Sequence, residues 1–237
     1  MARHIAAGID IGTRNTRVVI AERAGAEKPL AVLGVGESES RGLRHGYITH
    51  TEEAKKSILE AVLKAEKESG IRVRRALVSI GGLSLESGRG TGGTIISRVD
   101  GEVSQLDVEK AVSAAKEKAP GLLNKKIIHQ VVQQFKLDGK EVLGTPVGMR
   151  GMKLEVTVLF ISCLNQHLDD LVQAVEDAGI QVEDVAAAPI AASLVTLTKT
   201  QRTAGCVLVN IGAETVSLAV FENDKPTSLW PARSNSP

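Results

Sequence analysis

Apolar and polar residues form the same hairpin pattern at two places near opposite ends of the chain. The first stretch covers residues 4–22 and turns at Asp10-Ile11-Gly12-Thr13. The second turns at Asn210-Ile211-Gly212-Ala213-Glu214-Thr215. In each, an apolar strand reaches an Asp or Asn, then a glycine and hydroxyl residues, before a second apolar strand begins. This pattern predicts two β-hairpins with similar turns.

The residue types in these turns are suited to binding phosphate. Glycine lets the main chain approach an anion, N–H groups and hydroxyls bind it, and an acidic or amide side chain can hold a hydrated cation. A single turn is weak evidence, because Asp-x-Gly turns occur in many hairpins. Two copies favour duplicated halves that close on one polyphosphate. The candidate nucleotide-binding residues are Asp10, Gly12, Thr13, Asn15, Thr16, Asn210, Gly212, Ala213, Glu214 and Thr215. Asp10 and Asn210 are also candidate Mg²⁺ ligands through water.

The segment after the first hairpin predicts a strand at residues 30–36, a helix, and a strand at 75–80. Thr49 and Glu52 are spaced as a capping box for the helix, and Gly70 is placed to end it. One apolar stripe runs along the helix: Ala54, Ile58, Ala61, Val62 and Ala65. Strand, helix and strand predict an α/β layer, in which the hairpins make the sheet mixed.

The residue composition of the chain changes between Gly81-Gly82 and Met152. A run of glycines at 88, 90, 92 and 93 resembles a phosphate loop, but Gly-Lys-Ser/Thr is missing, which favours a flexible hairpin. Ser104 and Asp107 predict the start of a helix with an apolar face, and Pro120-Gly121 its end. Strands are predicted at 127–137 and 152–163, with a turn at 138–139 and a loop at 142–149. This strand–helix–strand–strand block is expected to be a small inserted subdomain.

The first half then resumes towards the second hairpin. Leu168, Leu171, Val172 and Val175 follow helical spacing, and Gly179 is expected to end that helix. A short strand at 181–185 and a helix of small residues at 190–197 follow, the latter opened by Pro189.

Composition excludes several classes of function. The formal net charge is +1 and aromatic residues make up 2%, so nucleic acid is not expected as a partner. Cys163 and Cys206 are isolated in apolar runs, which suits a reducing cytosol. The start of the chain lacks the apolar region of a signal peptide, and no window of 18 apolar residues exists. The histidines (4, 45, 50, 129 and 167) never fall at metal-ligand spacing, so packing or surface roles are expected for them.

Together these residues resemble the bacterial cell-division family FtsA, an actin-like ATP-binding scaffold. The similarity runs from Ile5 to Leu229 and is most specific at Gln133-Gln134-Phe135 and in the loop Gly144-Thr145-Pro146-Val147-Gly148-Met149-Arg150-Gly151. The resemblance implies an actin-like, ribonuclease H-like α/β half with an inserted strand–helix–strand–strand subdomain, plus the first hairpin of a second half. The implied segments are 1–82 and 163–201 for the first half, 83–162 for the insert, 202–229 for the second half, and 230–237 as a disordered or non-native tail.

Departures from the family pattern concern the phosphate loops. Asn15 stands where the family usually has Lys, which removes a counter-charge for phosphate, although Arg14 and Arg17 are nearby. The second loop usually carries Asp and three glycines. Here Asn210 cannot give Mg²⁺ a negative charge, Ala213 has less backbone freedom, and Glu214 is expected to bring a carboxylate near the phosphates.

The resemblance also implies ATP with Mg²⁺ as ligands, weak or lost here, and a scaffold rather than an enzyme. FtsZ and other division proteins are the implied partners, with self-association through the insert. The implied location is the cytoplasm, at the inner-membrane face of the division site. Membrane contact is expected only through a C-terminal helix that this chain lacks, because it is expected to be truncated. The alternatives are a PilM-like pilus-assembly protein and a phosphotransferase of the actin and sugar-kinase fold.

Overall fold

The computed structural model describes residues 4–25 and 29–233, and its first layer is a five-stranded mixed sheet in the order β11-β6-β1-β2-β3. Strand β1 pairs antiparallel with β2 and parallel with β6, so the mixed sheet expected from the hairpins is confirmed. Strand β3 continues three residues past the predicted end at 36. The five strands are β1 (His4–Ile11), β2 (Asn15–Arg23), β3 (Ala31–Glu39), β6 (Arg75–Ile80) and β11 (Gln181–Ala187).

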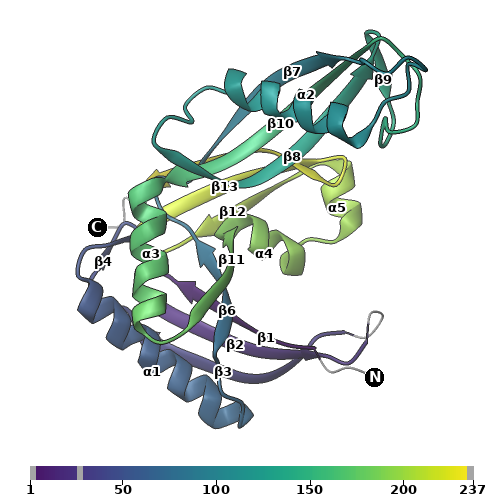
Figure 1. The fold of residues 1–237 in the computed structure, drawn as a ribbon. Helices are drawn as coiled ribbons and strands as arrows, with labels where there is room; N and C mark the ends of the chain where they lie inside the picture. Colours follow the sequence, from purple (N-terminus) through teal and green to yellow (C-terminus); the bar gives the residue numbers. More distant parts are fainter. Residues whose placement is uncertain (1–3, 26–28, 234–237) are drawn as a thin grey trace.

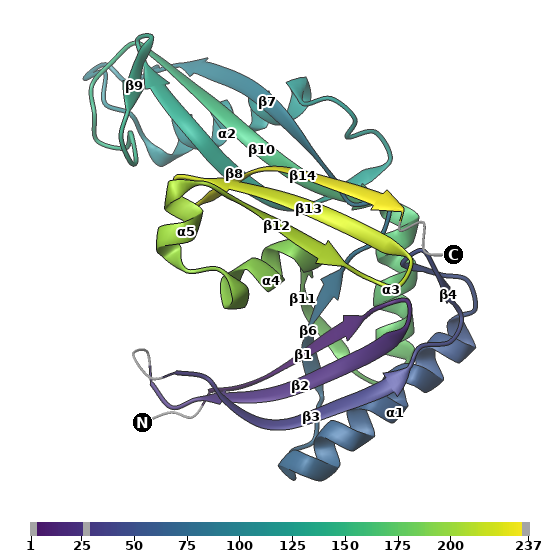
Figure 2. The same cartoon turned by 180° about the vertical axis from the view of Figure 1, so that it is seen from behind.

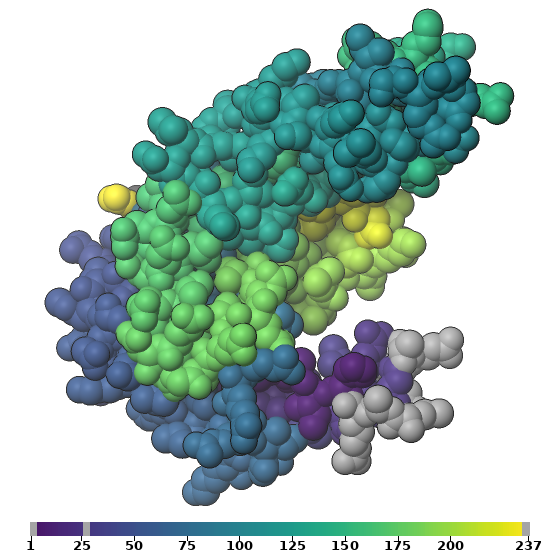
Figure 3. All heavy atoms as spheres, in the orientation of Figure 1, coloured from purple at the N-terminus to yellow at the C-terminus, as the bar shows by residue number. Residues whose placement is uncertain are grey.

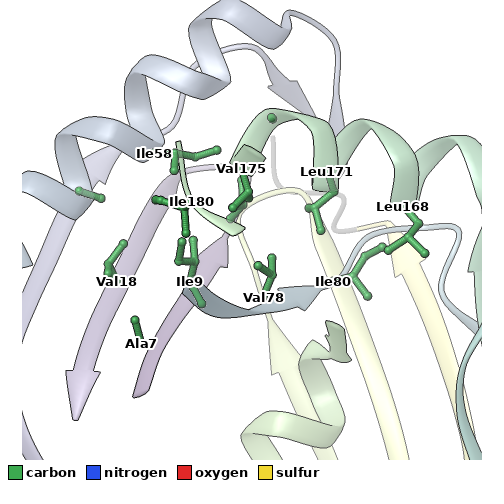
Figure 4. Close-up of a cluster of buried hydrophobic side chains, with 14 of the residues drawn as sticks. Ala7, Ile9, Val18, Ile58, Val78, Ile80, Leu168, Leu171, Val175 and Ile180 are labelled. Atoms are coloured by element: carbon green, nitrogen blue, oxygen red, sulfur yellow. The ribbon is translucent and has the colours of Figure 1, made fainter. Parts of the chain in front are cut away.

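Helices α1 (Thr51–Ser69) and α3 (Asn165–Asp177) lie side by side over one face of this sheet (Figure 1). Figure 4 shows Ile58 of α1 and Val175 of α3 directed at Ile9 and the neighbouring strands. The predicted apolar stripe of α1 is fully buried in this core. Removing these side chains from water provides the driving force for the layer.

The predictions for the two ends of α1 fared differently: the end at Gly70 is confirmed and the cap at the start is not. Gly70 adopts a left-handed conformation with φ of 71° and ends the helix as predicted. The predicted capping box of Thr49 and Glu52 is wrong, because His50 is the N-cap residue and makes no side-chain cap. The Thr49 hydroxyl instead donates to the Gly42 carbonyl at 3.0 Å, which holds the short β4–β5 hairpin (Leu43–Arg44 and Tyr47–Ile48).

The inserted block forms a separate four-stranded sheet in the order β7-β10-β8-β9, with α2 packed on one face (Figure 1). The helix start predicted at Ser104 and Asp107 is confirmed, and the two residues form a capping box in which each side chain is bonded to the other's main-chain N–H. The sheet and α2 enclose their own apolar cluster. The elements are β7 (Glu86–Ile95), α2 (Gln105–Lys118), β8 (Lys125–Leu137), β9 (Lys140–Val142) and β10 (Lys153–Leu164).

The glycine run is not a flexible hairpin, because it forms strand β7. Glycines 90 and 92 allow α2 to approach the strand closely. A Cβ on Gly90 would lie 2.0 Å from the Ala115 carbonyl oxygen, and one on Gly92 would lie 2.1 Å from the Ala115 nitrogen. The absence of side chains therefore serves tight packing of helix on strand rather than mobility.

A three-stranded antiparallel sheet, β12-β13-β14, follows helices α4 (Ala188–Thr196) and α5 (Lys199–Ala204) (Figure 2). Its strands are β12 (Cys206–Ile211), β13 (Thr215–Glu222) and β14 (Lys225–Arg233). Residues 230–233, the start of the tail expected to be disordered or non-native, are ordered as the end of β14, where Trp230 pairs with Leu218 of β13. Residues 234–237 of that expectation lie outside the described residues.

The space-filling view shows α3 packed between α1 and the insert, and a hollow between the N-terminal hairpin and α4 (Figure 3). Among residues 4–25 and 29–233, no helix combines the length and apolar character needed to cross a bilayer.

Candidate functional site

The two glycine turns have the same local geometry. The Gly12 N–H donates to the Asn15 carbonyl at 3.2 Å, and the Gly212 N–H donates to the Thr215 carbonyl at 2.8 Å. A Cβ on either glycine would lie 3.0 Å from that carbonyl oxygen, which is tighter than ordinary contact. The close approach across each turn therefore favours glycine.

The turns face each other across one pocket of about 440 Å³. The pocket is lined on one side by the end of β1 and its turn, and on the other by the end of β12 and its turn. Eight of the ten predicted site residues line it: Asp10, Gly12, Thr13, Asn15, Asn210, Gly212, Ala213 and Thr215. The structure thus brings these eight residues, taken from two distant segments, together around one pocket.

The polar side chains of the first turn are held by neighbours. Asp10 accepts a hydrogen bond from the Ser79 hydroxyl on β6, and Asn15 donates one to Glu37 on β3. Glu37 also pairs with Arg17 at 3.2 Å, so one of the two pocket-lining arginines is already neutralised. These bonds orient the first side of the pocket before any ligand enters.

Two predicted residues do not line the pocket. Thr16 is fully buried, and its hydroxyl lies 2.9 Å from that of Ser40, because alternation along β2 turns its side chain away from the turn. Glu214 accepts a hydrogen bond from the main-chain N–H of His45. The expectation that its carboxylate faces phosphates is therefore not matched by its position.

Several lining residues were not identified from the sequence. They come from α3, α4, β13 and two loops: Gly46, Gly81, Gly82, Leu171, Ala188 and Ser217. The pair Gly81-Gly82 directly follows a predicted strand, and this position could have identified it as part of the pocket. Gly46 precedes a short strand that periodicity does not reveal.

Below the pocket wall, His167 connects α3 to two loops. Its Nε2 lies 2.9 Å from the Gly46 carbonyl oxygen and its Nδ1 lies 2.6 Å from the Ser84 hydroxyl. Its ring centroid lies 4.5 Å from that of Tyr47. Burial lowers the pKa of His167, against the opposing effects of the hydrogen bond to Gly46 and the charge of Asp170. Of the surface or packing roles expected for the histidines, His167 has a buried, hydrogen-bonded position.

The donor set bears on whether a cation fits the pocket. Asp10 gives one carboxylate and Asn210 one amide oxygen, and no cluster of three metal-binding side chains exists within the described part of the chain. Mg²⁺ keeps several waters and is often held by one or two carboxylates together with substrate phosphates. The pocket residues therefore fit a hydrated ion that arrives with a polyphosphate, not a permanently coordinated one.

Comparison with known proteins connects this architecture to one family. Residues 82–162 match the model of the "SHS2 domain inserted in FTSA". The cell-division protein FtsA of Borreliella burgdorferi is 31% identical over 95% of this chain and 54% of its own length. FtsA of Bacillus subtilis is 32% identical over 93% of this chain and 49% of its own.

Two solved structures share the fold. A PilM–PilN type IV pilus biogenesis complex matches with a TM-score of 0.64 and 17% identity, over 95% of this chain and 60% of that one. The ethanolamine utilization protein EutJ of Carboxydothermus hydrogenoformans matches with a TM-score of 0.53 and 14% identity, over 100% of this chain and 54% of that one. At these identities the likeness concerns the fold alone.

Paired glycine hairpins around one pocket, on a mixed α/β framework with an inserted subdomain, define an actin-like protein, and the predicted fold class is confirmed. The chain spans about half the length of the curated relatives it matches. The matched insert and the sequence identity along nearly the whole chain agree in making it similar to the FtsA proteins. The PilM alternative is not favoured, because its support is limited to the fold.

Proposed function

We propose that this chain acts in bacterial cell division as an actin-like, ATP-binding scaffold. The observation that carries the proposal is the convergence of both glycine turns on one pocket in a chain that also has the FtsA-type insert. In the proposed role, the protein links the FtsZ ring to the membrane and recruits other division proteins at the cytoplasmic face of the inner membrane. The membrane contact belongs to a C-terminal helix of the full-length family.

The proposed organisation assigns residues 1–82 and 163–201 to one actin-like half and 83–162 to the insert. Residues 202–229 begin the second half. The separate apolar cluster of the insert supports its treatment as a unit of its own. The equivalent turn bonds of Gly12 and Gly212 support the assignment of the two hairpins to duplicated halves.

In the proposed nucleotide complex, main-chain N–H groups of the two turns and the Thr13 and Thr215 hydroxyls bind phosphates. Asp10 and Asn210 hold Mg²⁺ through water. Arg14 lines the pocket and supplies positive charge. Binding by this chain should be weak, because the described lining residues include no aromatic side chain on which a base could stack.

The same pocket favours a switch over a metabolic enzyme. Asp10 is the one carboxylate among the described lining residues, and it is already bonded to Ser79. A phosphotransferase needs a base that accepts the proton of the attacking hydroxyl and a pocket for its substrate. We expect turnover below about 1 s⁻¹, the low end of usual enzyme rates.

Partners follow from the insert in this proposal. Self-association and contacts with division proteins are assigned to residues 83–162, where Leu143 and Met152 are highly exposed. Nucleic acid is not a proposed partner, given the net charge of +1. Deleting residues 83–162 should abolish self-association measured by analytical ultracentrifugation.

Hydrogen exchange with and without Mg-ATP tests the nucleotide site. At millimolar ligand, the amides of Thr13 and Ala213, which follow the two turn glycines, should exchange more slowly, and Asp10→Ala should remove this protection. Thr91→Ala, on the exposed face of β7, is the matched control and should retain it. No protection of either turn in the unmodified protein would contradict the proposed site.

A further inference from the structure

The β4–β5 hairpin places a two-residue turn at the rim of the pocket. His45 and Gly46 form this turn, with φ of 52° and 85°, the left-handed values of a type I′ hairpin turn. The His45 main-chain N–H donates to the carboxylate of Glu214, 169 residues further along the chain. The same carboxylate oxygen lies 3.5 Å from His45 Nδ1. The two glycine-bearing halves are thus joined directly beside the pocket.

On the side of the first half, this turn is held firmly. His167 is 2% exposed and bonds the Gly46 carbonyl through Nε2. Gly46 also packs on the loop after β6, where a Cβ on it would lie 2.6 Å from the Gly82 Cα. Because the turn cannot shift easily against α3 or β6, a bond to His45 is effectively a bond to the first half.

On the other side, Glu214 lies in the turn between β12 and β13, whose sheet is fastened to the insert. Ser87 bonds Leu229, the Arg89 guanidinium donates to the Thr227 carbonyl at 2.8 Å, and Gln133 donates to the Pro226 carbonyl at 3.0 Å. Figure 2 shows β14 running beside the insert and β12–β13 reaching towards the first sheet. The bond between His45 and Glu214 therefore crosses from the first half to a unit made of the second sheet and the insert.

We propose that Glu214 is a positioning residue that sets the separation of the two glycine turns by holding the second turn on His45. The carboxylate acts as a charged acceptor for a main-chain N–H, a stronger hydrogen bond than a neutral one. Its neighbours Ala213 and Thr215 line the pocket, whereas Glu214 does not. Its effect on a ligand is indirect, and this part of the proposal rests on the nucleotide site proposed above.

Hydrogen exchange of the ligand-free 237-residue protein tests the contact directly. In Glu214→Ala the amide of residue 45 loses its acceptor and should exchange at least about tenfold faster, because protection follows the free energy of local opening. Glu214→Gln keeps an acceptor oxygen and should stay within about threefold of the unmodified protein. His45→Asn retains the main-chain N–H and tolerates the left-handed backbone, so it should also stay protected.

Exchange in β10 separates loss of this contact from loss of folding. It should be unchanged in all three variants, since β10 lies in the core of the insert. Unchanged exchange at residue 45 in Glu214→Ala would overturn the proposal, as would an equal rise in β10. Hydrogen exchange with millimolar Mg-ATP separately tests the proposed nucleotide site. If neither glycine turn becomes protected, the proposal of a nucleotide site is contradicted, while exchange at residue 45 in the ligand-free protein still decides the role of Glu214.

Discussion

The Ser87 side chain bonds both main-chain groups of Leu229, accepting its N–H at 2.8 Å and donating to its carbonyl at 3.1 Å. Ser87 lies on β7 of the insert, and Leu229 lies on β14, fully buried in the main core. The Ser87 hydroxyl thus bonds the main chain of the neighbouring sheet, beside the bonds that Arg89 and Gln133 make to the same strand.

Replacing this hydroxyl should weaken the junction between the sheets. Ser87→Ala leaves the Leu229 N–H without its partner, which should lower the free energy of unfolding by about 1–3 kcal/mol. Thr91→Ala, on the same strand but exposed, should change it by less than about 0.5 kcal/mol. Urea unfolding followed by circular dichroism compares the two. Equal effects would show that the junction with Leu229 adds no stability.

Close packing of α2 on β7 predicts intolerance at Gly92. A Cβ there would lie 2.1 Å from the Ala115 nitrogen, so Gly92→Ala should force the helix away and cost about 1–3 kcal/mol. Gly8→Ala on β1 is the matched control, because nothing lies within 4 Å of its added Cβ. The control should remain within about 1 kcal/mol of the unmodified protein. Thermal unfolding of both variants measures the difference, and similar melting temperatures would contradict the packing.

Stability should fall as the pH is lowered from 7.5 to 5.5. Burial lowers the pKa of His167 and of His129, so the unfolded chain takes up protons first as the pH drops below about 6.5. The stabilisation that comes from keeping these two histidines neutral is complete above the pKa of histidine in the unfolded chain. It is lost progressively as the pH falls below that value. His167→Gln cannot titrate and should show a shallower dependence, although it is less stable at pH 7.5. Chemical unfolding across this pH range is the measurement, and an unchanged slope would contradict the effect of burial.

The two cysteines should differ in reactivity. Burial foremost, with the charge of Asp169, raises the pKa of Cys163 to about 11, and its side chain is fully buried. At pH 8 this thiol is protonated and inaccessible, so iodoacetamide should not modify it. Cys206 is partly exposed and should be alkylated. Mass spectrometry of native protein should find one modification, and urea should allow both. Native modification of Cys163 would contradict its burial.

Local signals in the sequence predicted the elements that depend on local chemistry. The capping box of Ser104 and Asp107 forms because the residues that make it are three apart in one turn of chain. The glycine turns were predicted for the same reason, and their repetition indicated the shared pocket. In contrast, the Thr49 hydroxyl does not cap α1, because the β4–β5 hairpin brings it to the Gly42 carbonyl, with which it forms a hydrogen bond instead.

The individual side-chain contacts between distant segments were beyond prediction. Glycines 90 and 92 have the composition of a loop, and the helix that requires their small size is identified only by the packing. Glu214 was expected near phosphates because its turn resembles a phosphate loop. Its actual partner, the main-chain N–H of His45, depends on a left-handed turn that periodicity does not indicate.

The glycine strand of the insert provides a way to recognise this architecture in other chains. Gly90 and Gly92 are two residues apart on β7 and lie on the same face of the strand. They face Ala111 and Ala115, which are one helical turn apart on α2. Because the backbones touch there, a side chain at either glycine would push α2 away from β7. A Gly-x-Gly strand followed by an Ala-x-x-x-Ala helix is therefore a search pattern, by which such inserts could be found even where overall sequence similarity has faded.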